Sequence, residues 1–290
     1  MKRTAAGLGL LLALTLAGLA QSSDFSEFAD ASKSSAHMME LFGIGGRPTN
    51  GDAANPLKIL VNHAYAVGDS ESRRCPVWAM YHADKFQGAT PPVSFVRTGF
   101  FFPDSRVSPV VDGRTFGGGM DRGHMVPNAA IASQYGSLAQ LETFYMSNMC
   151  PQASDLNQRA WMQLEGYVSK VAQIKNMVYV ISGPIFGPNP AVIKNGPERG
   201  VQVPDAFYMI LVDSDREFQD KPKLDTIAFR FPQGTPADAS FKDRAKFGTS
   251  IDAIEVETGF NFFPEFDENF GTSWANEEKK AAGTVWATTP

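Results

Sequence analysis

Five short apolar runs limit how this chain of 290 residues can fold. Each run is rich in β-branched or aromatic residues and is bounded by turn residues, a pattern that predicts β-strands. The runs are Lys58–Val67, Val77–His82, Met177–Ile181, Phe207–Val212 and Thr226–Phe231. The second run follows the first after a loop around Asp69–Arg74, so we expect these two strands to be antiparallel neighbours.

One long helix and two short ones are predicted between and after these strands. The segment Asp155–Gln173 carries an apolar stripe at spacings of three, four and three residues, as an amphipathic helix requires. Asp155 followed by Gln158 resembles a capping box, which predicts that the helix starts there. Shorter helices are expected over Ser137–Tyr145 and Ser250–Glu257, the second ended by a glycine.

The order of these elements predicts an α+β fold. Helices and strands do not alternate regularly, so we expect a mixed, mostly antiparallel central sheet flanked by helices. Residues 86–120 are rich in Gly, Pro and Phe and are expected to be mostly loop. No linker divides the chain after residue 56. We therefore expect a loose lead-in over residues 21–56, with a short helix around His37–Phe42, one domain over residues 57–270 and a tail over residues 271–290.

The N-terminus has the pattern of a secretory signal peptide. Lys2 and Arg3 precede an uncharged run from Ala5 to Ala20, which is shorter than the ~20 residues of a membrane-spanning helix. We expect residues 1–20 to be removed after Ala20, leaving a secreted or periplasmic protein with no membrane partner. The alternative is a retained membrane anchor.

The two cysteines exclude several kinds of site. Cys75 and Cys150 are too few for a disulfide scaffold, a four-cysteine zinc site or an iron–sulfur cluster. In an exported protein they are compatible with one disulfide. They are equally compatible with two separate buried thiols.

The charge of the chain excludes an overall basic coat. The formal net charge is −5, whereas a protein that coats itself in nucleic acid is usually basic. Between residues 97 and 175, however, seven basic side chains stand against six acidic ones. The sequence therefore predicts a small basic cleft, with a solvated acidic segment over residues 252–278.

One of the four histidines has neighbours that suggest catalysis. His37, His63 and His82 are most simply surface or core side chains. His124 lies in the segment D-R-G-H-M-V-P, two residues after Arg122. An arginine can bind phosphate, and an imidazole with a pKa near neutrality can act as a general base.

A second group of polar residues follows within the predicted long helix. Asn157 and Glu165 are eight residues apart, which places them ~80° apart around a helix and ~12 Å apart along it. This spacing allows Asn157 to bind a metal ion directly and Glu165 to bind it through water. Oxygen ligands and water suit Mg²⁺ better than Zn²⁺. The alternative is that Asn157 only caps the first helical turn.

Three motifs in order then resemble a known family. D-R-G-H-M-x-P, S-N-x-x-P-Q and L-N-Q-x-x-W-x-x-L-E, over residues 121–165, are similar to the DNA/RNA non-specific endonucleases. This family includes secreted bacterial sugar-non-specific nucleases and mitochondrial endonuclease G. Weaker similarity covers residues from about 58 to 263. The resemblance implies a ββα-metal active site within a nuclease catalytic domain over residues 57–270.

The resemblance also implies roles for the motif residues. His124 matches the general base, and Asn157 matches the only side chain that binds Mg²⁺ directly, which Mn²⁺ can replace. Glu165 matches a carboxylate that holds metal-bound waters. Arg122 matches the arginine near the phosphate, and Asn148 matches an asparagine that supports the histidine.

Two further positions are less well defined by the motifs. Arg97 is the best match to an upstream phosphate-binding arginine. Some family members carry an arginine four residues after the glutamate, where Ser169 stands here. The neighbouring Lys170 could replace that arginine only loosely, because lysine lacks a planar fork of donors.

The expected activity is phosphodiester hydrolysis. The resemblance implies an exported metal-dependent endonuclease that cleaves DNA and RNA with little sequence specificity and leaves 5′-phosphate ends. The alternative is a catalytically weak, nuclease-like protein that binds nucleic acid. Another exported hydrolase would need a G-x-S-x-G or H-E-x-x-H motif, and neither occurs. A homodimer is compatible with the sequence, and an inhibitor partner cannot be read from it.

Overall fold

The computed structural model describes residues 42–50, 55–86, 96–112, 116, 119–196, 198–213, 225–270 and 279–289. These residues belong to one compact unit within residues 39–290. The predicted signal peptide lies outside the described residues, as does all but the last residue of the predicted helix around His37–Phe42. In the described part of the chain, no helix is long and apolar enough to cross a membrane.

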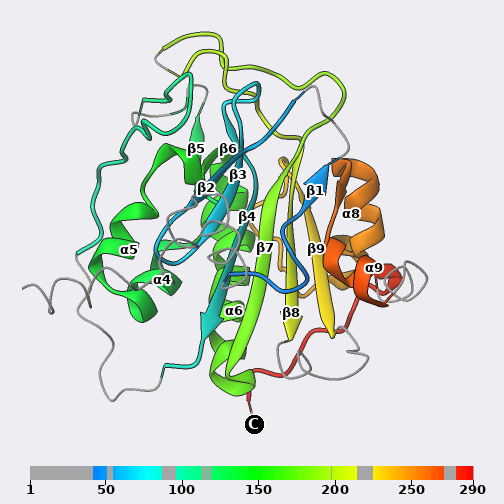
Figure 1. Ribbon diagram of the computed structural model, residues 1–290. Coiled ribbons are helices and arrows are strands. Elements are labelled where there is room, and N and C mark those ends of the chain that lie inside the picture. Colours follow the sequence, from blue (N-terminus) through cyan, green and yellow to red (C-terminus); the bar gives the residue numbers. More distant parts are fainter. Residues whose placement is uncertain are drawn as a thin grey trace, which may run out of the picture. The chain divides into compact units, whose positions relative to one another are not determined.

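A seven-stranded antiparallel sheet forms the centre of this unit (Figure 1). Every neighbouring pair in it is antiparallel. In sheet order its strands are β10 (Gly248–Thr249), β9 (Thr226–Pro232), β8 (Ala206–Asp213), β7 (Met177–Ile185), β4 (Cys75–Asp84), β3 (Ala66–Ser70) and β2 (Lys58–Val61). The predicted α+β class is confirmed, and the strands predicted in the second half of the chain lie within β7, β8 and β9.

The first predicted strand is in fact two strands. The chain turns back between β2 and β3, where the Asn62 N–H donates to the Tyr65 carbonyl at 2.8 Å. Asn62 and Tyr65 are both buried in this turn. The sequence hid the turn because its residues lie within an otherwise continuous apolar, β-rich run. Of the two strands within the first predicted run, only β3 pairs with β4, and this pairing is antiparallel as expected.

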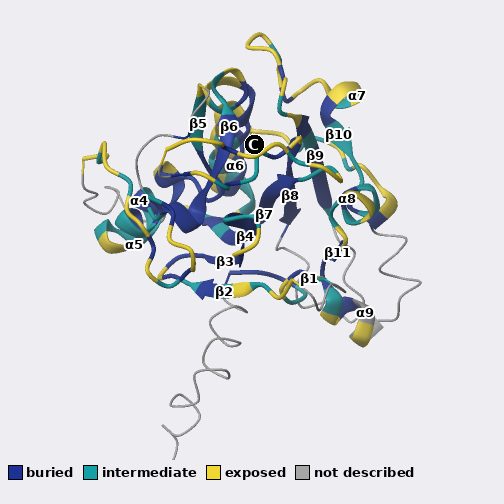
Figure 2. Cartoon of the chain, turned by 90° about the horizontal axis from the view of Figure 1, so that it is seen from above, coloured by how far each residue is buried: buried dark blue, intermediate teal, exposed yellow. Residues whose placement is uncertain are grey.

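Both faces of the sheet are covered. Val178 and Val180 of β7 pack into the cluster that contains α6 (Met162–Lys175), whereas Tyr179 and Ile181 pack into the cluster beneath α8 (Ile251–Thr258). This alternation explains why the central strands are apolar on both sides. Figure 2 shows them buried between the two layers.

Two predicted short helices are present, and three others were missed, of which the shortest is α7 (Arg244–Phe247). Ser250 caps α8 through its hydroxyl, and Gly259 ends it with a left-handed backbone (φ 73°). The other predicted helix is α5 (Ser137–Glu142). The sequence missed α4 (Asn128–Tyr135), whose small residues form no clear apolar stripe, and α9 (Pro264–Phe270), which follows α8.

The described ends of the unit are packed rather than loose. Phe42 and Ile44 are buried, and β1 (Thr49–Asn50) pairs with β11 (Phe260–Asn261). In the predicted tail, the buried Lys279 ammonium lies 3.0 Å from Glu255. Parts of both the expected lead-in and the expected tail therefore belong to the folded unit.

Candidate active site

A strand–strand–helix unit carries the three sequence motifs. β5 (Met120–His124) pairs antiparallel with β6 (Met149–Ala153), and this ribbon is separate from the central sheet. A π-helical segment, Leu156–Trp161, follows β6 and continues into α6. Such wide helical turns are rare and are often found at functional sites. The two strands and the helix bring the three motifs into one ββα arrangement.

The glycine of the first motif allows the two strands to pack closely. Gly123 stands opposite Cys150 in the ribbon, and Gln152 is fully buried beside it. A Cβ atom on residue 123 would lie 2.3 Å from Gln152 Oε1. A side chain at this position would therefore displace Gln152 or the strand that carries His124.

His124 is held in an aromatic and cationic surrounding. Phe101 lies against it with ring centroids 5.7 Å apart, and Phe144 meets it edge-on at 5.5 Å. The Arg122 guanidinium lies 3.8 Å from the centroid of the Phe101 ring. Arg122 and His124 are two residues apart on β5, so their side chains leave the same face of the strand.

The imidazole of His124 is neutral over the physiological range. Its side chain is 8% exposed, and among the described residues no group hydrogen-bonds its Nε2. Burial, followed by the charges of Arg97 and Arg122, lowers the pKa of His124 to about 3. The expected pKa near 6.5 is therefore wrong for the free protein. Nε2 is buried away from solvent, so water would reach the ring through its other nitrogen, Nδ1.

Asn148 fixes the backbone next to this histidine. Its Oδ1 accepts from the Val126 N–H at 2.9 Å, and its Nδ2 donates to the Val126 carbonyl at 3.0 Å and to the Thr143 carbonyl at 2.9 Å. The side chain is completely buried. Asn148 therefore positions the chain just after His124 and does not reach the cleft.

Asp121 orients the amide of Asn157. Asp121 Oδ2 accepts from Asn157 Nδ2 at 2.9 Å and from Gln158 Nε2 at 2.8 Å. Partial burial raises the pKa of Asp121, but these bonds and one from Ser154 outweigh it and hold the pKa below its ordinary value. Because Nδ2 faces the carboxylate, Oδ1 of Asn157 is the atom left to bind a cation.

The predicted capping box at the start of this helix is wrong. The Asp155 side chain makes no capping hydrogen bond, and Gln158 bonds Asp121 instead. The helical backbone already begins at residue 154. The pattern misled because both residues suit a helix start, whereas the tertiary contact with β5 offered Gln158 a charged acceptor.

Glu165 lies in the first turn of α6. Burial raises its pKa to about 8, against the lowering effects of the Trp161 indole and the Arg97 charge. A desolvated carboxylate of this kind is stabilised by a nearby cation. Glu165 and Asn157 Oδ1 both offer oxygen donors, a chemistry that suits Mg²⁺ or Mn²⁺. No cluster of three or more His, Cys, Asp or Glu residues that could hold a metal occurs in the described ranges.

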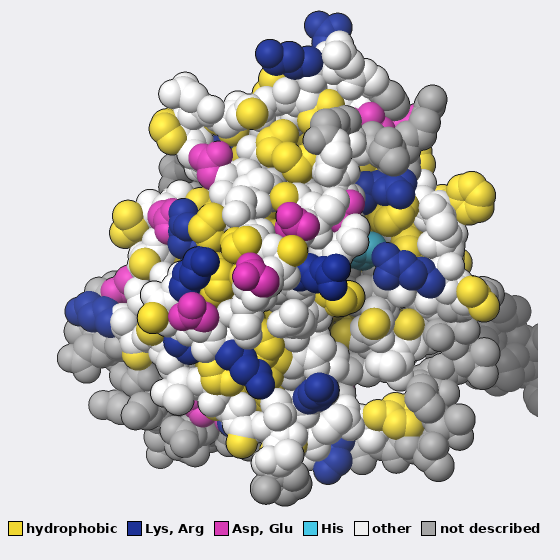
Figure 3. Space-filling model, turned by 180° about the vertical axis from the view of Figure 1, so that it is seen from behind, with side chains coloured by type: hydrophobic (Ala, Val, Ile, Leu, Met, Phe, Trp, Pro, Cys, Tyr) yellow, Lys and Arg dark blue, Asp and Glu magenta, His cyan; other side chains and the backbone are white. Residues whose placement is uncertain are grey.

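A cleft of about 450 Å³ brings several of these groups together. Its wall includes Arg97, Phe101, Asp121, Arg122 and Asn157. The charges of Arg97 and Arg122 act on His124 behind this wall. Figure 3 shows Lys and Arg side chains on both sides of a histidine that lies in a hollow of one face. The predicted basic cleft is thus present in an acidic chain.

Lys170 does not lie on the helical face of Glu165, so it does not take the place of the arginine that some family members carry there. It is exposed and lies five residues after Glu165, about 140° around the helix. Ser169, on the face of Glu165, donates its hydroxyl to the Glu165 carbonyl at 3.2 Å.

The other histidines lie in separate contacts. His63 pairs with Glu142, and His82 bonds Asp84 and Tyr135. Both cysteines are buried, free thiols, and the Cys150 thiol donates to the Pro76 carbonyl.

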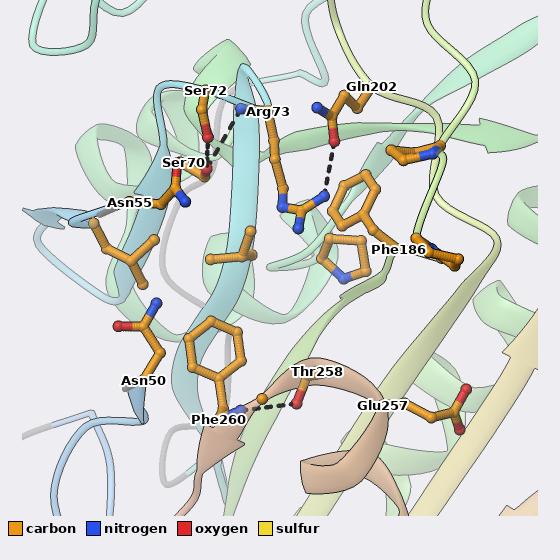
Figure 4. A pocket seen from close by; sticks show the side chains of 17 residues that line it. Asn50, Asn55, Ser70, Ser72, Arg73, Phe186, Gln202, Glu257, Thr258 and Phe260 are labelled. Carbon is orange, nitrogen blue, oxygen red and sulfur yellow. Dashed lines mark hydrogen bonds between the residues drawn. The ribbon is translucent and has the colours of Figure 1, made fainter. Parts of the chain in front are cut away.

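A larger cavity of about 770 Å³ lies on the α8 side of the sheet (Figure 4). In it the Arg73 guanidinium donates to Gln202 Oε1 at 2.7 Å and stacks over Phe186 at 4.4 Å. No histidine lines this cavity. Although this cavity is larger than the cleft, it therefore lacks the general base expected of the catalytic site.

Sequence reasoning missed two features that shape the site. Phe101 separates Arg122 from His124, yet it lies in a segment read only as loop. The sequence likewise did not predict that Asp121 would orient Asn157. The Phe100–Phe102 run of three aromatic residues was the one signal that could have drawn attention to this loop.

Comparisons with known proteins agree with this geometry. The nuclease of Serratia marcescens is 29% identical over 221 residues, which cover 74% of this chain and 77% of that nuclease. Human mitochondrial nuclease EXOG is 28% identical over 241 residues, covering 79% of this chain and 61% of EXOG. Human mitochondrial endonuclease G is 30% identical over 155 residues, about half of each chain.

The fold and the family are also matched. A chain from the crystal structure of an EndoG/EndoGI complex superposes with a TM-score of 0.61 at 22% identity, covering 79% of this chain and 91% of that chain. This likeness supports the α+β fold with its ββα-metal unit. The model of the family described as DNA/RNA non-specific endonuclease matches residues 47–269. The chain therefore belongs to the DNA/RNA non-specific endonucleases, a family of metal-dependent nucleases.

Proposed function

We propose that this protein is an exported, Mg²⁺-dependent endonuclease that hydrolyses phosphodiester bonds of DNA and RNA and leaves 5′-phosphate ends. One observation carries the proposal. A neutral, nearly buried His124 lies within the influence of the charges of Arg97 and Arg122, and these two arginines share a cleft with Asn157. Hydrolysis of a phosphodiester needs a base for water, positive charge for the phosphate and support for the leaving oxygen.

The side chains divide these tasks. The His124 ring accepts the proton of the attacking water, because it is unprotonated at neutral pH. Arg97 and Arg122 neutralise the phosphate oxygens, and the contact of Arg122 with Phe101 limits its motion. Asn148 keeps the backbone after His124 in place. The two arginines line a cleft that is already formed.

Asn157 and Glu165 would hold the metal ion. Asn157 Oδ1 would bind it directly, since Nδ2 is occupied by Asp121, and Glu165 would bind its water shell. When bound, Mg²⁺ supplies positive charge that stabilises the phosphate and the leaving oxygen. Mn²⁺ prefers the same oxygen ligands and would substitute.

Low sequence specificity follows from the groups that face the cleft. Arginines and an amide recognise phosphate and metal, and phosphates are the same in every sequence. No helix-turn-helix or zinc-finger motif occurs in the sequence. The same cleft would therefore serve DNA and RNA.

Export is proposed from the N-terminal sequence. A basic start and the uncharged run from Ala5 to Ala20 match a cleavable leader. Mass spectrometry of the protein recovered from the periplasm or medium should show an N-terminus at residue 21. Recovery of the intact N-terminus in the membrane fraction would instead indicate an anchor.

A plasmid-nicking assay tests the activity and separates it from the alternative of a binding protein without catalysis. Purified protein with Mg²⁺ should convert supercoiled plasmid to nicked and linear forms and should also degrade RNA. EDTA should abolish both reactions, and labelling the products with and without phosphatase should show 5′-phosphates. Binding to nucleic acid without metal-dependent cleavage would contradict the proposal.

A further inference from the structure

Phe100 presents an aromatic ring to solvent at the edge of the catalytic cleft. Its side chain is 76% exposed, whereas the adjacent Phe101 turns inward against Arg122 and His124. Val96 is 93% exposed and Phe102 is 38% exposed in the same segment. A single exposed apolar residue needs no explanation. Three such residues within one short segment that also supplies Arg97 and Phe101 to the cleft make this segment a candidate contact surface.

The backbone that carries Phe100 is held on both sides. The Phe100 N–H donates to Thr98 Oγ1 at 3.0 Å. Two residues on, the Phe102 N–H donates to the Phe144 carbonyl, and the Phe102 carbonyl accepts from the Met146 N–H, each at 2.9 Å. An ordered segment therefore presents the ring. When a ligand binds to it, little conformational entropy of this segment would be lost.

The residues on either side of Phe100 line the cleft. Arg97, Thr98 and Gly99 precede it and Phe101 follows it, and all four border the same space as Arg122. A polynucleotide whose phosphate lies between the two arginines would therefore bring a nucleoside near Phe100. Inside a duplex the faces of that base are covered by its neighbours, whereas in a single strand they are open.

We propose that Phe100 stacks on an unpaired nucleobase next to the phosphate held by Arg97 and Arg122, and so favours single-stranded or locally unstacked substrates. This inference rests on the proposed nuclease function and adds a substrate preference to it. Every base has an aromatic face, so stacking on Phe100 adds affinity without reading sequence. The ring thus supplies an apolar contact that phosphate-binding arginines cannot.

Oligonucleotides with and without bases test this contact. Binding is measured in the full chain with His124→Ala and EDTA, which prevent cleavage, using a fluorescein-labelled single strand of thymidylates and an abasic strand of equal length and charge. Phe100→Ala should weaken binding of the thymidylate strand roughly 5- to 50-fold and should change binding of the abasic strand less than about twofold. Phe100→Trp should restore the preference for bases.

A matched control lies outside the cleft. Val256 on α8 is 86% exposed, and Val256→Ala should change neither affinity. In otherwise native protein, Phe100→Ala should lower the ratio of kcat/KM for single-stranded over double-stranded DNA by a similar factor.

The outcomes distinguish this inference from the proposed function. An unchanged thymidylate-to-abasic ratio in Phe100→Ala overturns the stacking contact, as does an equal loss for both strands, which would indicate a structural role. In either case the native protein would still nick plasmid. If the native protein neither nicks plasmid nor binds either strand, the proposed function fails and this inference fails with it.

Discussion

At the scale of single residues, His124 is the group on which hydrolysis depends. His124→Ala should lower kcat on DNA and RNA together by ~10²–10⁴-fold, because a general base contributes about that much and one cleft serves both sugars. Binding of a phosphodiester in EDTA should persist, since Arg97 and Arg122 are unchanged. His63→Ala, at a histidine paired with Glu142 on the surface, is the control. A folded His124→Ala protein with near-native activity would contradict the mechanism.

The environment of His124 also changes the expected pH dependence. The sequence alone predicts that activity falls below ~6.5, the ordinary histidine value. With the pKa of His124 lowered to about 3 by burial and by Arg97 and Arg122, the free protein keeps its base unprotonated well below that pH. The quantity kcat/KM reports the free enzyme. At saturating Mg²⁺ it should therefore not fall between pH 7 and pH 5 through protonation of His124. Any loss of kcat/KM in this range should persist in His124→Ala. A titration of kcat/KM near 6.5 would show that the imidazole is less buried than this.

Asn157 and Glu165 should differ in their response to substitution. Asn157→Ala removes the amide oxygen that Asp121 orients, so Mg²⁺ titration should require at least tenfold more metal. Glu165→Gln keeps shape and one carbonyl oxygen, so its effect should be smaller. Activity against Mg²⁺ concentration measures both, and identical titrations would reject the division into direct and water-mediated ligands.

At the scale of elements, the β5–β6 ribbon depends on the absence of a side chain at Gly123. Gly123→Ala would place its Cβ 2.3 Å from Gln152 Oε1 and 2.6 Å from Gln152 Cβ. Overpacking of this kind costs about 1–3 kcal/mol, and it should also lower kcat because His124 follows on the same strand. Thermal unfolding and nicking assays would measure the two effects.

A second substitution tests whether Gln152 is the cause. Gln152→Gly removes both clashing atoms, so the double variant should recover part of the stability and activity lost in Gly123→Ala. Strictly additive losses would show that the two positions do not interact.

At the scale of the whole molecule, stability should depend on the protonation of the buried Asp69. Burial, followed by the charges of Asp104 and Glu71, raises the pKa of Asp69 from 3.8 to about 7. The folded state therefore holds a proton that the unfolded state releases at about 4. The contribution of the protonated Asp69 to the free energy of unfolding is fully present below pH 4 and is lost as the pH rises to about 7. The loss reaches up to ~4 kcal/mol, at about 1.4 kcal/mol per pH unit.

Asp69→Asn should remove this dependence, because the amide is neutral at every pH. Chemical unfolding of native protein and variant at pH 5 and pH 7.5 would measure it, with Asp238→Asn at the exposed surface as the control. If the native protein loses no stability between pH 5 and pH 7.5 relative to Asp69→Asn, Asp69 does not hold a proton in the folded state.

The sequence by itself predicted most strands of the central sheet and named the residues of the candidate site. Apolar runs predicted β7, β8 and β9, because their alternate side chains are buried on both faces. The order of the three motifs predicted that His124, Arg122 and Asn157 act together, since such motifs are local and carry their own chemistry. The signal peptide and the oligomeric state remain predictions.

Tertiary structure alone decided how those residues behave. The Gln158 bond to Asp121 and the aromatic wall of Phe101 and Phe144 join segments far apart in the chain. Burial and two neighbouring arginines moved the pKa of His124 by several units. A local pattern states which group is present, but desolvation and charge depend on what packs around it, and only the folded chain sets that.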